Sequence, residues 1–197
     1  LSHWAETLGL VFCADKDRSF DDRFSEFSHL QQGSNRYAYN IIEGRYNKYS
    51  FSAFDYHYET HSTDSKGRRE THHHYFSAVV VDTGFPLKPL FIRNETIFDK
   101  VGEFFGFDDI DFELAEFSRE FMVKSPDRRW AFDVLHQESM EFLLASPRFT
   151  LDMQNRRVLA YRSGTLSVAE LEQGLDVVTG LIDRLPDSVV RELKEAH

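Results

Sequence analysis

Histidines are the residues of this sequence whose spacing could do chemistry. His72, His73 and His74 are consecutive, and His57 and His61 precede them by a short interval. Imidazole nitrogens and carboxylate oxygens bind Zn²⁺ when three or four of them meet around one point. The sequence therefore raises the hypothesis of a zinc site. Whether such a site can form depends on how the chain positions these side chains.

The elements that carry the histidines are two predicted strands. Apolar and polar residues alternate over 49–60 and 70–81, and the polar segment 63–68 supplies a turn, so we expect an antiparallel hairpin. A slip of one residue would turn the apolar side chains of one strand toward the polar face of the other. The large side chains should therefore share a face, with Phe54, Tyr56 and Tyr58 from one strand beside Phe76, Ala78 and Val80 from the other.

This register divides the histidines between the two faces of the hairpin. His72 and His74 lie on the face of the tyrosines, whereas His73 lies with His57 and Glu59 on the other. We take His72 and His74, with a carboxylate from elsewhere, as the candidate zinc ligands. The alternative is a solvated hairpin tip, in which histidines stack on tyrosines or pair with glutamates.

Signatures of known catalytic sites are absent from the sequence. It contains no Gly-x-Ser-x-Gly, no His-Glu-x-x-His and no glycine-rich phosphate loop. His136 follows a helix that is predicted to begin at Asp127, where a histidine more often interacts with the helix dipole than acts as a base. We therefore predict no catalytic and no cofactor-binding residues.

Composition excludes some classes of protein. The chain has 197 residues, with 33 Asp and Glu against 23 Lys and Arg, and its net charge of −10 argues against a nucleic-acid-binding surface. No apolar stretch reaches the 18 or more residues that a membrane-spanning helix needs. The only cysteine, Cys13, ends the apolar run 10–12, so we expect a buried thiol rather than a reactive one.

The predicted fold is α+β, with a mainly antiparallel sheet, flanking helices and a C-terminal amphipathic helix. We expect a single domain over residues 1–197, with a helical C-terminal subregion at 163–197. Ser167 and Glu170 form a capping-box pattern that begins the C-terminal helix, and Pro186 interrupts it. Further strands are predicted at 10–13, 37–46, 90–93, 149–153 and 157–162, and further helices at 2–8, 94–105, 127–135 and 138–145.

Residues 116–144 resemble a family of uncharacterised bacterial proteins that are grouped as a domain of unknown function. The pattern falls on Phe117, Phe121, Val123, Asp127, Ala131, Leu135, Met140 and Leu143. Many members of that family carry one or two hydrophobic segments ahead of a soluble domain. The resemblance implies that this chain is a soluble domain tethered to the bacterial inner membrane, with the cytoplasmic side favoured. It supplies no activity.

Two functions follow from these observations. The first is a non-catalytic binding or scaffold domain of a membrane-associated bacterial protein, which acts on an unknown protein partner or on the membrane surface and binds no nucleic acid. The second is a metal-dependent hydrolase that uses histidines of the 57–74 hairpin, with zinc as its cofactor.

Overall fold

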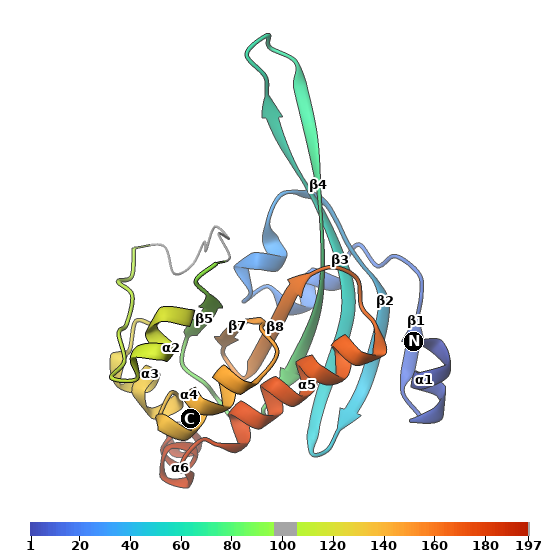
Figure 1. Ribbon diagram of the computed structural model, residues 1–197. Helices are drawn as coiled ribbons and strands as arrows, with labels where there is room; N and C mark the ends of the chain where they lie inside the picture. Colours follow the sequence, from blue (N-terminus) through green and yellow to red (C-terminus); the bar gives the residue numbers. More distant parts are fainter. Residues whose placement is uncertain (97–105, 197) are drawn as a thin grey trace.

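The computed structural model describes residues 1–96 and 106–196 and contains one eight-stranded sheet, in which every pairing is antiparallel. The order of the strands is β1-β2-β3-β4-β8-β7-β5-β6 (Figure 1). Their bounds are β1 Val11–Cys13, β2 Ser34–Tyr46, β3 Tyr49–Thr63, β4 Arg69–Asp82, β5 Leu90–Asn94, β6 Phe121–Lys124, β7 Thr150–Gln154 and β8 Arg157–Ser163. Together with the helices, this sheet confirms the predicted α+β class.

The helices in the described residues are α1 Ser2–Thr7, α2 Ala115–Glu120, α3 Arg128–Val134, α4 Gln137–Ala145, α5 Val168–Asp183 and α6 Asp187–Glu195. The predicted capping box begins α5, because Ser167 accepts a hydrogen bond from the Glu170 backbone and the Glu170 carboxylate accepts one from the Ser167 backbone. Figure 1 shows α5 lying across one face of the sheet, where Gly174 approaches Val79 of β4 closely. The predicted C-terminal helix is therefore confirmed.

Two clusters of buried side chains cover the two faces of the sheet. One contains Val79 and Val81 of β4 together with Trp130 of α3 and the apolar side of α5. The other lies on the opposite face, where the 3-10 helices η1 (Phe20–Phe24) and η2 (Ser28–Gln31) bring aromatic side chains onto β3 and β4. The predicted register is confirmed, since Phe54 pairs with Ala78 and Tyr56 with Phe76 and all four belong to this second cluster.

The β3–β4 ribbon extends beyond the rest of the sheet (Figure 1). Pairing between β2 and β3 ends at Glu59, and pairing between β4 and β8 ends at Phe76, whereas β3 and β4 remain paired as far as Thr63 and Arg69. We call residues 60–73 the hairpin arm. Its turn is held by the Asp64 carboxylate, which accepts hydrogen bonds from the backbone of Lys66 and Arg68 and from the Arg68 side chain. The arm is therefore an ordered ribbon with solvent on most sides.

Cys13 is exposed, so the expected burial of its thiol is wrong. The reason is that β1 is a three-residue edge strand whose alternation turns Val11 and Cys13 outward and only Phe12 inward. The helix expected at 94–105 lies almost entirely outside the described residues, although Asn94 does accept a hydrogen bond from the backbone of Thr96.

Within residues 1–96 and 106–196, no helix combines the length and the apolar character needed to cross a membrane.

Candidate functional site

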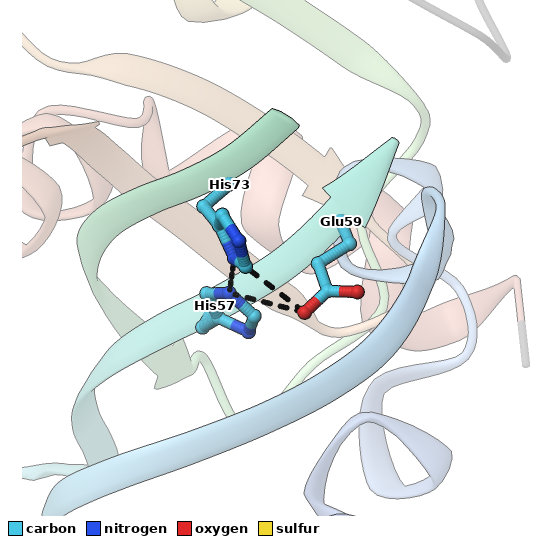
Figure 2. Close-up of side chains that lie close together, drawn as sticks. All are labelled: His57, Glu59 and His73. Carbon is cyan, nitrogen blue, oxygen red and sulfur yellow. Dashed lines mark hydrogen bonds and ion pairs between the residues drawn. The ribbon is translucent and has the colours of Figure 1, made fainter. Parts of the chain in front are cut away.

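Three metal-competent side chains meet at the base of the hairpin arm. His57 and Glu59 are two residues apart on β3 and so share a face, and His73 lies opposite Glu59 on β4. Nε2 of His57 lies 3.1 Å from Nδ1 of His73, and Oε1 of Glu59 lies 3.5 Å from that Nδ1 and 4.0 Å from Nε2 of His57 (Figure 2). These residues are the ones that the predicted register places on one face, and the structure shows that their donor atoms converge.

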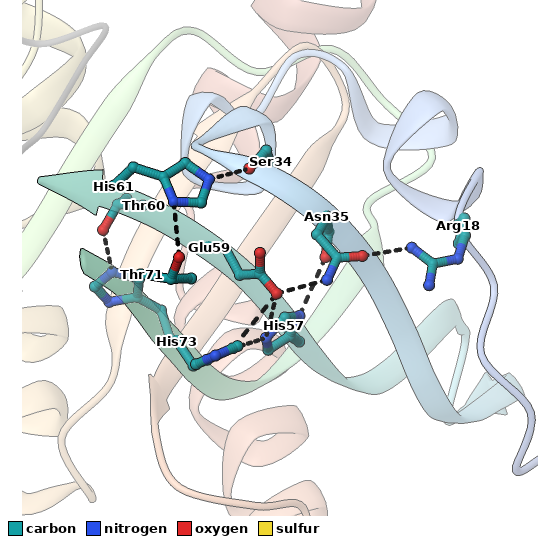
Figure 3. Close-up of polar contacts among 10 residues, drawn as sticks. Arg18, Ser34, Asn35, His57, Glu59, Thr60, His61, Thr71 and His73 are labelled. Carbon is teal, nitrogen blue, oxygen red and sulfur yellow. Dashed lines mark hydrogen bonds and ion pairs between the residues drawn. The ribbon is translucent and has the colours of Figure 1, made fainter. Parts of the chain in front are cut away.

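Strand β2 orients this cluster through one residue, Asn35. Its backbone carbonyl oxygen lies 3.1 Å from Nδ1 of His57, and its side-chain Nδ2 donates to Oε1 of Glu59 at 2.6 Å. Arg18 in turn donates to Oδ1 of Asn35 at 2.6 Å (Figure 3). Asn35 adopts a left-handed backbone conformation with φ 49°, which asparagine tolerates better than most residues. The cluster therefore has a fixed outer layer of hydrogen bonds.

Burial differs along the cluster. His57 is only 2% exposed and lies between the rings of Tyr37 and Tyr75, and this burial lowers its pKa, so that the imidazole is neutral near pH 7. The hydrogen bond from Asn35 lowers the pKa of Glu59, which is therefore a carboxylate. His73 is half exposed, with 53% of its side chain in contact with solvent. The site is thus anchored in the sheet and open on the side of β4.

The predicted zinc ligands His72 and His74 lie on the other face of the β3–β4 ribbon. His72 contacts the hydroxyl of Ser62 at 2.7 Å, and His74 contacts the hydroxyl of Thr60 at 2.8 Å and stacks on the ring of Tyr58. Among the residues that the structure describes, neither belongs to a group of three metal-competent side chains. The stacking of His74 on Tyr58 matches the alternative described above, whereas the polar partners of both histidines are hydroxyl groups and not the glutamates that the alternative named.

The hydrogen bonds of His136 connect two helices. Its Nε2 lies 2.8 Å from the carbonyl oxygen of Arg184 and 3.1 Å from the hydroxyl of Ser139. Because a carbonyl oxygen can only accept, Nε2 must carry the proton and cannot serve as a base toward Ser139. Ser139 is moreover completely buried. This pair joins the start of α4 to the end of α5 and has no nucleophilic role.

A second histidine-containing environment lies beneath the arm on the face of the tyrosines. A cleft of about 330 Å³ is lined by aromatic side chains and by Arg162, and the ring of His29 stacks on that of Tyr161 at a centroid distance of 3.9 Å. Burial, with a smaller contribution from His74, lowers the pKa of His29 to about 4. His29 is therefore neutral and acts as part of the aromatic packing.

Sequence reasoning missed Asn35, although a signal for it was present. Residues 31–35 have the composition of a loop, and β2 in fact begins at Ser34 with an irregular register before Tyr37. Asparagine tolerates a left-handed backbone position better than most residues, and Asn35 is the asparagine of this loop segment. No sequence feature, however, indicates that such a residue would contact both His57 and Glu59.

Comparisons with known proteins give a fold and no family. No family model matches the chain, and no curated protein matches it. Among solved structures, the crystal structure of the mycobacterial trehalose monomycolate transport factor A, TtfA, is similar with a TM-score of 0.68, over 92% of this chain and 90% of that one. At 12% sequence identity, this similarity establishes a shared fold.

Proposed function

We propose that this chain is a non-catalytic accessory domain that assists transport at a bacterial membrane by binding a protein partner. The observation that carries the proposal is the similarity to TtfA, which is described as a transport factor and which shares the fold over nearly the full length of both chains. A fold alone does not determine a function, so the proposal also depends on what the structure can hold.

The packing of the sheet favours binding to a partner over enclosing a lipid. Both faces of the sheet are filled by large side chains such as Trp130, Phe54 and Phe27, which are almost completely buried. Five surface clefts in the described part of the chain measure about 330 to 440 Å³, and each is lined in part by charged or polar side chains. Sites for apolar ligands are predominantly hydrophobic cavities. Because the interior on both faces of the sheet is filled, these clefts lie at the surface, where a protein partner can contact them.

Lipid analysis of the organism that encodes the chain tests the proposal. Deletion of the gene should leave one lipid class chemically intact but retained in the membrane where it is made, and a plasmid copy should restore its distribution. Mass spectrometry of separated membranes reports both identity and location. If the deletion strain instead lacks a finished lipid and accumulates its precursor, the chain performs a chemical step and the proposal is wrong.

We also propose that the domain is tethered to the inner membrane on its cytoplasmic side. The support is the resemblance of residues 116–144 to bacterial domains that follow hydrophobic segments. The coding sequence upstream of Leu1 tests this directly, because a spanning helix needs about 20 apolar residues. A full-length protein without such a segment, recovered from the soluble fraction of lysed cells, would contradict the tether and leave the accessory role open.

A further inference from the structure

The hydrogen bond between His57 and Asn35 determines which nitrogen of His57 is available to a ligand. The carbonyl oxygen of Asn35 can only accept, so Nδ1 of His57 carries the proton and Nε2 presents a lone pair. That lone pair points toward His73 and Glu59. In metal sites, a ligating histidine usually donates its other N–H to a carbonyl or carboxylate in this manner, which fixes the tautomer and the orientation of the ring.

The three donor atoms have the separations of a metal-binding triangle. A point equidistant from atoms that lie 3.1, 3.5 and 4.0 Å apart is about 2.1 Å from each of them. Bonds from Zn²⁺ to histidine nitrogen and carboxylate oxygen are about 2.0–2.2 Å long. The donor atoms are therefore spaced for bonds to one ion, and rotation of the side chains would bring the longest separation, between Glu59 and His57, closer to tetrahedral geometry.

We propose that His57, Glu59 and His73 bind a divalent transition-metal ion such as Zn²⁺. Two imidazoles and one carboxylate suit zinc and its neighbours, whereas Ca²⁺ and Mg²⁺ require oxygen ligands. Three protein ligands leave a fourth position for water or for a group from a partner. Asn35 holds the Glu59 carboxylate in place and accepts from His57, so it supplies the outer layer that such sites need.

The location of the site gives the ion a structural consequence. His57 and Glu59 belong to β3 and His73 to β4, and their shared partner Asn35 belongs to β2. The ion would therefore join β3 to β4 next to Ser34↔Glu59, the last pairing of β2 with β3, where the arm leaves the sheet. We expect it to stabilise the junction between the arm and the sheet.

Metal titration of adjacent histidine variants tests this inference. Protein purified without a histidine tag is titrated with ZnCl₂ by calorimetry and with CoCl₂ by visible absorption, which reports the coordination geometry of the ion. His73→Asn removes a proposed ligand, and His72→Asn is its matched control, because the two residues are neighbours in β4, are both exposed and face opposite sides of the arm. Circular dichroism confirms that both variants are folded.

We expect one Zn²⁺ per chain in the wild type, no response to MgCl₂ and a melting temperature that rises with zinc concentration. His73→Asn and Glu59→Gln should each weaken zinc binding at least about 10-fold, and His72→Asn should leave it unchanged. Equal losses in His72→Asn and His73→Asn would mean that zinc binds the exposed histidines without a defined site. That result, or substoichiometric binding by the wild type, would overturn the inference.

Discussion

Acidification should destabilise this protein through His29, and the effect can be isolated with one substitution. His29 lies in the aromatic packing beneath the arm, stacked on Tyr161 and adjacent to Phe76. Replacement by phenylalanine keeps an aromatic ring at this position and removes the titrating group. The stability of the wild type and of His29→Phe can then be compared across pH.

The magnitude follows from the lowered pKa. In the folded protein the pKa of His29 is about 4, against 6.5 for an ordinary histidine, so the unfolded chain binds the proton more readily. The contribution of neutral His29 to stability is complete above pH 6.5 and is lost as the pH falls toward 4. At about 1.4 kcal/mol per pKa unit, the wild type should lose about 2 kcal/mol between pH 7.5 and pH 5 through this group alone.

Urea denaturation at a series of pH values measures this loss. Groups that do not interact with His29 titrate equally in both proteins, so the difference between wild type and His29→Phe reports His29, with a smaller contribution from its neighbour His74. We expect the difference to change by about 2 kcal/mol between pH 7.5 and pH 5, with the wild type losing more. Parallel pH profiles for the two proteins would show that His29 is not desolvated in the folded state and would refute the reasoning.

Four further substitutions, one of which is a control, test the packing around the sheet by chemical denaturation. Gly33→Ala should lower the free energy of unfolding by more than about 3 kcal/mol, because Gly33 has φ +62° and a Cβ there would collide with the backbone of Glu59. Gly67→Ala is the control at the open tip of the arm, where φ is +78° and no neighbour is close, and it should cost only about 1–2 kcal/mol. Similar losses in the two variants would mean that the contact between residue 33 and Glu59 relaxes. Ser167→Ala should cost about 1 kcal/mol through loss of the α5 cap, and an unchanged midpoint would show that the cap adds nothing. Asp55→Ala should cost about 2–4 kcal/mol, because Asp55 is 1% exposed and two N–H donors lose their acceptor; a loss below about 1 kcal/mol would indicate that water replaces the carboxylate.

The register of the hairpin could be predicted because it depends on two simple constraints. Side chains alternate along a strand, and the aromatic residues of β3 must meet the apolar residues of β4. The same argument placed His57, Glu59 and His73 on one face. Helix caps were equally accessible, since the carboxylate of Asp127 and the hydroxyl of Ser167 accept from the backbone three residues later, as the pattern indicates.

The convergence of the cluster could not be predicted from alternation alone. The cluster is contacted by Asn35, which lies in a segment of loop composition and adopts a left-handed conformation beside an irregular pairing of β2 and β3. The short helix α2 and the outward side of β1 were missed for a related reason. Elements of three to six residues carry too few alternations to reveal which side chains face the core, and Cys13 is the example.

The length of the hairpin arm sets how far this molecule can reach. Four residues of β3, Thr60–Thr63, continue past the last pairing with β2, and at about 3.3 Å per residue they hold the turn roughly 13 Å away from the sheet. A two-stranded ribbon is only marginally stable by itself, so the stability of the arm depends on the sheet from which it extends. Insertion, deletion or substitution of cross-strand residue pairs at the tip would therefore leave both buried clusters unchanged. Such changes would alter what the tip contacts without altering the rest of the fold.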